Sequence, residues 1–144
     1  MQEVVAWTAL EVSDSRGMIS GEADMANDNH AVHFEGSAPI LRVENMAAAL
    51  HFYVDLLGFK NVHWGTDEFT SISRDQAHIY LCRNGQGLGK AWVWIGVEDA
   101  AKLHEEVRAR GVSVRMPPTN FSWALEMHLE DPDGNVLRFG SDPQ

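Results

Sequence analysis

Apolar positions in the first half of the chain follow one helical spacing framed by short strand-like runs. From Met46 to Leu57 they recur at the spacing of a helix with one buried side. Asn45 stands at the expected N-cap of this helix, and Gly58 stands where it would end. Strands are expected around it at residues 40–43, 59–64, 69–73 and 77–83. The pattern therefore predicts the order strand–helix–strand–strand–strand.

The second half of the chain repeats this order. Residues 97–99 (Val-Glu-Asp) match residues 43–45 (Val-Glu-Asn), so Asp99 takes the N-cap position of a second helix, which ends at Gly111. Its strands are expected at residues 91–97, 112–115, 123–130 and 136–140, with a loop opening at Met116. We therefore predict an α+β fold of two βαβββ modules, at about 38–84 and 91–141, in one domain over 38–144.

The first 37 residues do not follow this pattern. Ser, Gly, Asp, Asn and Glu dominate residues 13–29, so residues 1–37 are expected to form an N-terminal extension, looped or extended. His30 and His33 form an H-x-x-H pair in this extension, which is more typical of solvated histidines than of a metal site.

The net charge limits the classes of binding partner, and the cysteine content indicates the cellular compartment. The 144 residues carry a formal net charge of −10 at pH 7, which argues against nucleic acid and against anionic membrane surfaces. The same charge favours cationic ligands or serves solubility alone. No run of about 18 apolar residues could span a membrane. Cys82 is the single cysteine and no export signal is visible, so a cytoplasmic location is expected.

Several motifs carry a resemblance to a known family. Phe52-Tyr53, residues 57–59 (Leu-Gly-Phe) and residues 131–135 (Asp-Pro-Asp-Gly-Asn) resemble the glyoxalase/bleomycin resistance protein/extradiol dioxygenase superfamily, also called vicinal oxygen chelate proteins. Residues 91–95 (Ala-Trp-Val-Trp-Ile) are closest to its bleomycin-binding resistance proteins. The resemblance implies two βαβββ modules that curl into half-open barrels. It also implies a homodimer with ligand sites in concave grooves.

The resemblance also locates the metal-ligand positions of the family's enzymes. They fall on Ala38, Tyr80, Trp92 and Arg138 of this chain. Alanine, tryptophan and arginine offer such an ion no ligand, and a guanidinium repels it. We therefore expect no cofactor and no metal, and a binding protein rather than an enzyme. The alternative is a lyase or dioxygenase that uses other ligands, such as His78, Glu126 and His128, or His33 from the extension.

Strand parity predicts what occupies the groove instead. Alternate residues of a strand face opposite sides, so Trp92 and Trp94 share one face while Val93, Ile95 and Val97 share the other. The candidate ligand-binding residues are mainly aromatic, with a few polar ones: Trp64, Phe69, His78, Tyr80, Trp92, Trp94, Trp123, Glu126, His128 and Arg138.

Such a surface suits a small molecule that is aromatic or cationic, with bleomycin-type antibiotics as the leading class and sequestration as the mode of resistance. Three alternatives stay open from the residues alone. The Trp92 face could meet a dimer partner instead of a ligand. Glu126 and His128 could lie on an exposed edge. Arg138 could form a buried ion pair with Glu126.

Overall fold

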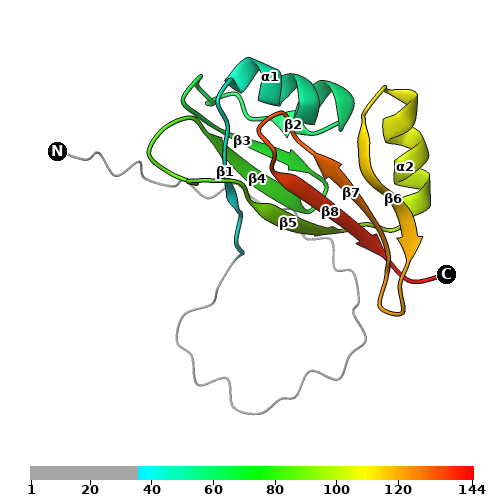
Figure 1. The fold of residues 1–144 in the computed structure, drawn as a ribbon. Coiled ribbons are helices and arrows are strands. Elements are labelled where there is room, and N and C mark those ends of the chain that lie inside the picture. Colours follow the sequence, from blue (N-terminus) through cyan, green and yellow to red (C-terminus); the bar gives the residue numbers. More distant parts are fainter. Residues whose placement is uncertain (1–35) are drawn as a thin grey trace, which may run out of the picture. The chain divides into compact units, whose positions relative to one another are not determined.

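The computed structural model describes residues 36–144 of the chain (Figure 1). The predicted extension over residues 1–37, with its H-x-x-H pair, lies outside the described residues except for Gly36 and Ser37. Within the described part, two four-stranded sheets and the helices form one α+β unit. None of the helices described is long and apolar enough to cross a membrane.

The first module contains one sheet with the strand order β1-β4-β3-β2. Strand β1 pairs with β4 in parallel, and the other neighbours are antiparallel. Its elements are β1 (Ile40–Arg42), α1 (Met46–Leu50), η1 (His51–Leu56), β2 (Lys60–Asn61), β3 (Phe69–Arg74) and β4 (Ala77–Cys82).

The second module has the equivalent strand order, β5-β8-β7-β6, again with its first strand parallel to its last. Its elements are β5 (Trp92–Gly96), α2 (Ala100–Ala109), β6 (Val114–Asn120), β7 (Leu125–Glu130) and β8 (Val136–Ser141). The predicted pair of βαβββ modules is therefore confirmed, because both halves have the same element order and the same pairing. In Figure 1 the helices of both modules lie on the same side of the strands.

The helix starts follow the predicted capping. The Asn45 side chain accepts a hydrogen bond from the Ala48 amide at 3.0 Å, and Asp99 accepts one from the Lys102 amide at 3.0 Å. These contacts satisfy amide groups that have no partner inside the helix. The first helix differs from the prediction in its second half, where η1 is a π-helix. On η1 the neighbours Phe52 and Tyr53 are both buried.

Two predicted strand boundaries are wrong. The strand expected at residues 59–64 is limited to Lys60–Asn61, because the chain turns after Val62, whose carbonyl accepts from the Gly65 amide. The loop expected at Met116 belongs instead to β6. Strand β6 is the edge of its sheet and its register shifts twice, so two prolines without N–H groups fit into it.

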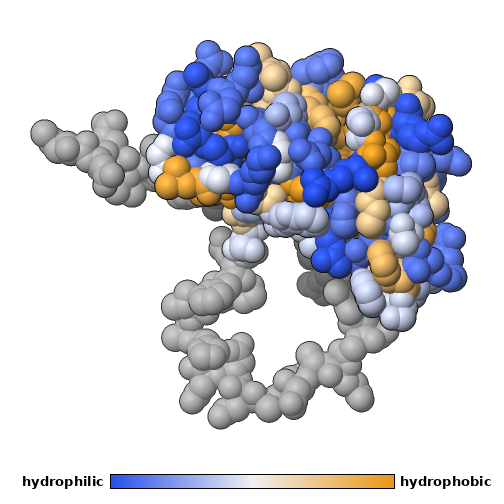
Figure 2. Space-filling model, in the orientation of Figure 1, coloured by the Kyte–Doolittle hydropathy of each residue, from blue (hydrophilic) through white to orange (hydrophobic). Residues whose placement is uncertain are grey.

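The two modules share one hydrophobic core and are joined by a buried polar link. The core contains Leu41, Ile72 and Ile79 from the first module, and Met127 and Leu137 from the second. Figure 2 shows hydrophilic residues over much of one face, with apolar residues gathered between the helices of the two modules.

The polar link joins η1 to the turn between β7 and β8. The Tyr53 hydroxyl donates to Asp131 Oδ2 at 2.9 Å, and both residues are buried. Asn135 Nδ2 donates to the Arg42 carbonyl at 3.1 Å. The turn over residues 131–135 thus fixes the two modules to each other.

Candidate functional site

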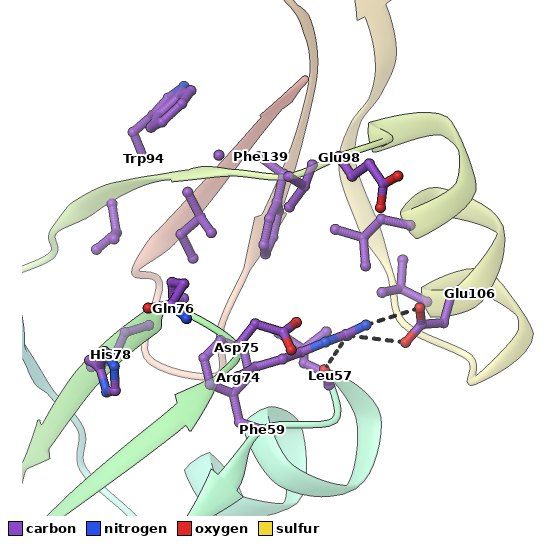
Figure 3. Close-up of a pocket in the computed structure, with 18 of the residues that line it drawn as sticks. Leu57, Phe59, Arg74, Asp75, Gln76, His78, Trp94, Glu98, Glu106 and Phe139 are labelled. Carbon is purple, nitrogen blue, oxygen red and sulfur yellow. Dashed lines mark hydrogen bonds and ion pairs between the residues drawn. The ribbon is translucent and has the colours of Figure 1, made fainter. Parts of the chain in front are cut away.

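Strand β5 separates two different surfaces. Trp92 and Trp94 project from one side and are 58% and 60% exposed. The other side borders a cleft of about 870 Å³ between the modules, and Figure 3 shows Trp94 projecting away from it. The predicted parity is therefore present. Val93, Ile95 and Val97 are only half-buried, however, so that side of β5 is less completely covered than its apolar sequence predicts.

The Trp92 side of β5 continues across the sheet as an aromatic and charged surface, called here the tryptophan face. Trp94 is the register partner of Arg138, and Arg138 is the register partner of His128. Residues directly opposite on neighbouring strands point to the same side of a sheet. The structure therefore brings together Trp92, Trp94, Glu126, His128 and Arg138, as predicted from strand parity.

Glu126 is the buried anchor of the tryptophan face. Its carboxylate accepts from Arg138 Nε and Nη2, both at 2.8 Å, and from Trp123 Nε1 at 3.0 Å. The bonds from Arg138 are the main reason that the pKa of Glu126 lies below its ordinary value, although burial opposes them. The same contact raises the pKa of Arg138. The edge-strand interpretation is wrong, because β7 is an inner strand of its sheet.

His128 and Arg115 hold the Trp92 indole from two directions. The His128 ring meets it edge-on at 5.4 Å between centroids, and the Arg115 guanidinium lies 5.4 Å from its centroid. Burial lowers the pKa of His128, so its neutral form is favoured. Its Nε2 is buried without a hydrogen bond within residues 36–144, because Glu126 Oε2 lies 3.8 Å away.

Two residues of the tryptophan face were missed by sequence reasoning. Arg115 ends the run predicted as a strand, and in the structure it forms an ion pair with Glu130. Phe121 stacks on Trp123 with centroids 4.8 Å apart and planes 7° from parallel. In the sequence, this stack is indicated only by the separation of two residues between Phe121 and Trp123.

The first module carries a separate ladder of three aromatic rings, called here the aromatic ladder. Trp64 stacks on Phe69 at 6.4 Å and 16°, and Phe69 stacks on Tyr80 at 5.3 Å and 23°. Burial raises the pKa of Tyr80, so its phenol stays neutral. The predicted residues Trp64, Phe69 and Tyr80 are thus in contact, although the strand expected to carry Trp64 is a turn.

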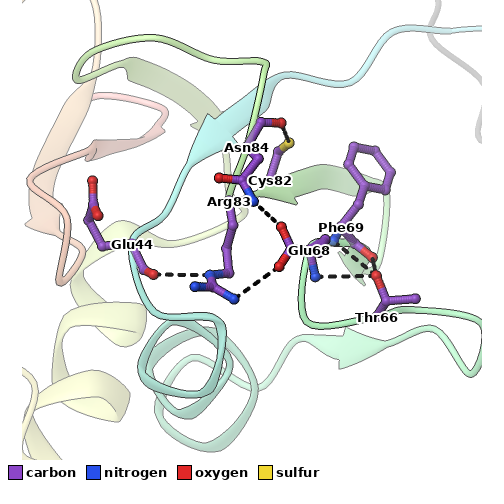
Figure 4. A network of polar contacts seen from close by, with 7 residues as sticks. All are labelled: Glu44, Thr66, Glu68, Phe69, Cys82, Arg83 and Asn84. Carbon is purple, nitrogen blue, oxygen red and sulfur yellow. Dashed lines mark hydrogen bonds and ion pairs between the residues drawn. The ribbon is translucent and has the colours of Figure 1, made fainter.

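A polar network holds the loop that carries Phe69 into the ladder (Figure 4). Thr66 Oγ1 accepts from the amides of Glu68 and Phe69, both at 3.2 Å. The Glu68 carboxylate accepts from Arg83 Nη1 at 3.2 Å and also from Asn84 Nδ2. These contacts tie the loop to the end of β4, which limits the freedom of the Phe69 ring.

The remaining candidate, His78, does not join the tryptophan face. It is exposed on β4, opposite Ser73, and lines the cleft rather than lying near Glu126 and His128. In the described range 36–144, no group of three or more His, Cys, Asp or Glu side chains is arranged to hold a metal ion.

The four family metal positions do not fit a divalent ion of the glyoxalase type. Tyr80 is part of the aromatic ladder, Trp92 packs on His128, and Arg138 is bound to Glu126. Ala38, just before β1, has no donor side chain. Glu126 is the nearest carboxylate to Arg138, but both of its oxygens already accept hydrogen bonds.

Many solved protein structures share this fold. A bleomycin-binding protein from bleomycin-producing Streptomyces verticillus, solved with copper(II)-bleomycin, is 28% identical with a TM-score of 0.60, covering 78% of this chain and 99% of its own. A lactoylglutathione lyase from Agrobacterium tumefaciens is 16% identical with a TM-score of 0.61, covering 74% and 93%. A protein from the mobile metagenome of V. Pseudocholerae is 19% identical with a TM-score of 0.64, covering 80% and 100%.

Sequence comparison defines the family. No curated protein matches the chain. The family model described as Glyoxalase/Bleomycin resistance protein/Dioxygenase superfamily matches residues 29–139. This match spans most of the chain and agrees with the paired βαβββ modules. The protein therefore belongs to the glyoxalase/bleomycin resistance protein/dioxygenase superfamily.

Proposed function

We propose that this protein binds a planar aromatic small molecule and acts by sequestering it, with bleomycin-type antibiotics as the leading class. The observation that carries the proposal is the set of large aromatic side chains left exposed on both sheets. Trp64, Trp92, Trp94 and Trp123 are 46–64% exposed. Clusters of large exposed aromatic rings are typical of binding surfaces rather than of a monomer's ordinary surface.

The tryptophan face offers both stacking and directional contacts. Each accessible indole would contribute about 0.5–1.5 kcal/mol by stacking on a ligand ring. Trp94 lies flat over Gly140, whose lack of a side chain allows the indole to come within 3.1–3.3 Å of the position a Cβ would take. Arg138 is 39% exposed, so its guanidinium can donate to a ligand oxygen while it stays bound to Glu126.

Stacking, rather than charge, accounts best for selectivity on this face. The chain as a whole is acidic, but the two cations of the face are paired, Arg138 with Glu126 and Arg115 with Glu130. A cationic group on the ligand therefore gains little from the tryptophan face itself. The overall charge of −10 would still favour the approach of a cationic antibiotic.

A homodimer is part of the proposal. Each sheet has one aromatic surface, and a second copy could place the ladder of one chain opposite the tryptophan face of the other. A symmetric pair would cover apolar surface that a single chain leaves open. Light scattering is expected to give twice the 16.0 kDa chain mass at micromolar concentration. A 16.0 kDa particle would contradict the dimer. A cytoplasmic location also stays a prediction.

The test is titration calorimetry with metal-free bleomycin and with copper-loaded bleomycin. We expect a Kd far below 1 mM for the wild-type protein. W92A and W94A should each weaken the affinity by about 2-fold to 13-fold, which is the fold-change equivalent to the stacking energy of one indole. Leu88→Ala, an 86% exposed residue of the linker, serves as the control and should leave the Kd unchanged.

Two results would overturn the proposal. One is an affinity no better than about 1 mM for both forms of the antibiotic. The other is a stoichiometric transition metal in protein purified without chelator, which would favour a metal-dependent lyase or dioxygenase with non-standard ligands.

A further inference from the structure

The cleft lies on the side of β5 opposite the Trp92 and Trp94 indoles. It has an apolar floor and polar side chains around its opening, called here the mouth. Its floor includes the buried side chains of Phe59, Ile79 and Phe139 and the half-buried side chains of Val93 and Ile95. The Phe139 ring points into it from the second module (Figure 3). A volume of about 870 Å³ is in the range of small-molecule sites, most of which are lined by apolar side chains.

Strand β5 makes this cleft unusual for a packed domain. Half-buried Val93, Ile95 and Val97 belong to the face of the strand that would normally be covered by a helix. Helix α2 contacts β6, β7 and β8, and contributes Leu103 and Val107 to the far wall. Within residues 36–144 the space between α2 and β5 is therefore open to an apolar occupant.

The charges around the mouth are unbalanced. Four carboxylates line the cleft (Asp75, Glu98, Asp99 and Glu106) against two cationic side chains (Arg74 and Lys102). His78 also lines it, and is counted as neutral. The Arg74 guanidinium is already engaged, donating to the Leu57 carbonyl at 2.7 Å and to both oxygens of Glu106 at 3.1 and 3.2 Å.

Two of the carboxylates are available to a ligand. Asp99 caps α2 and Glu106 forms an ion pair with Arg74. Asp75 and Glu98 are therefore the two cleft carboxylates that are not already engaged in these contacts. Both are exposed, they come from different modules, and neither has an ion-pair partner within residues 36–144. A cation in the cleft would thus face one carboxylate on each wall, while its apolar part lay on the floor.

We propose that the cleft between the modules is a second binding site, which takes a lipophilic organic cation. The apolar floor provides the contact area, and Asp75 and Glu98 select the positive charge. Strand β5 lies between this site and the tryptophan face, and Trp94 is the one residue of that face that also borders the cleft, with its indole projecting the other way. The site does not depend on the proposed function of that face.

The experiment compares two ions of matched shape and opposite charge. Tetraphenylphosphonium and tetraphenylborate are titrated into the full chain by equilibrium dialysis. We expect the cation to bind at least 10-fold more tightly than the anion. D75N/E98Q should raise the Kd for the cation at least 10-fold, and a 10-fold change in Kd corresponds to about 1.4 kcal/mol.

The control variant removes the same number of charges elsewhere. E105Q/D142N changes two exposed carboxylates that do not line the cleft, and it should alter cation binding less than 2-fold. A W92A/W123A variant, which changes two exposed tryptophans that do not line the cleft, should also bind the cation normally. Equal binding of the two ions, no binding at 1 mM, or a loss caused by W92A/W123A instead of D75N/E98Q would overturn the proposal.

Discussion

Replacing Tyr53 by phenylalanine tests the polar link between the modules. The Tyr53 side chain is fully buried, and its hydroxyl donates to Asp131 Oδ2 at 2.9 Å. Asp131 also accepts from the amides of Asp133 and Asn135 and from Asn135 Nδ2, at 2.8–2.9 Å. Four donors on one carboxylate match its ionised form, which can only accept. Y53F removes one of these donors without changing the packing of the ring.

The expected cost follows from the charge of the acceptor. A hydrogen bond to a charged group contributes about 1.5–3 kcal/mol, and the lost donor cannot be replaced by water at a buried site. We therefore expect Y53F to lower the free energy of unfolding by about 1.5–3 kcal/mol. For a domain of this size that corresponds to a decrease of about 5–12 °C in Tm.

Urea denaturation at pH 7, followed by circular dichroism, measures this cost. Asp131→Asn provides the matched background, because it removes the charge and leaves one acceptor oxygen in place of two. In that background Y53F should cost about 1 kcal/mol or less, the value for a neutral bond. A Y53F cost within about 0.5 kcal/mol of zero in the wild-type background would refute the role assigned to the link.

The same residue predicts an alkaline limit on stability. Burial, followed by the nearby Asp131 charge, raises the pKa of Tyr53 well above its ordinary value of 10.0. A raised pKa in the folded state means that the phenol contributes stability which is complete below pH 10 and is lost as pH rises further. The stability of wild type should fall above pH 10, and Y53F should lack this part of the decline.

Three further predictions concern the site and the backbone. Because Arg138 holds the pKa of Glu126 low, the stability from this carboxylate is present above its unfolded pKa near 4.5 and is lost as pH falls through its folded pKa. The difference between wild type and E126Q in urea midpoint should therefore shrink on acidification, and a constant difference would contradict the pairing. Gly87 has φ +67°, and a Cβ there would lie 2.8 Å from the Ile40 carbonyl oxygen, whereas Gly85 has φ +80° and open space. G87A should cost more than the roughly 1 kcal/mol of G85A in thermal melts, and equal costs would count against the close approach. Asp99→Ala should cost about 0.5–2 kcal/mol by removing the cap of α2, and a neutral result would show that the cap is not used.

The fold was predictable because each module repeats a local pattern. Capping residues, glycines with positive φ and alternating apolar positions are local signals, and they located α1, α2, β3, β4, β5 and β8. The errors occurred where local rules conflict with sheet pairing. Two prolines argued for a loop after Met116, but an edge strand with register shifts accommodates them in β6. The π-helical part of η1 has no recognisable signal in the residues.

The tryptophan face was predictable in composition but not in its contacts. Strand parity placed Trp92 and Trp94 beside Arg138, because neighbouring strands in register share a face. The Trp123 contact to Glu126 and the Arg115 contact to Trp92 depend on how β6 and the following loop fold back, which no spacing records. The cleft was not predicted, since an apolar face on β5 has the same sequence whether or not it is covered.

The most direct test of the central claim is a crystal structure of the protein with metal-free bleomycin. Our account predicts electron density for the planar rings of the antibiotic against Trp92 and Trp94, with a ligand acceptor near Arg138. Density for the antibiotic away from both aromatic surfaces, or a transition metal coordinated by side chains of the tryptophan face, would contradict it.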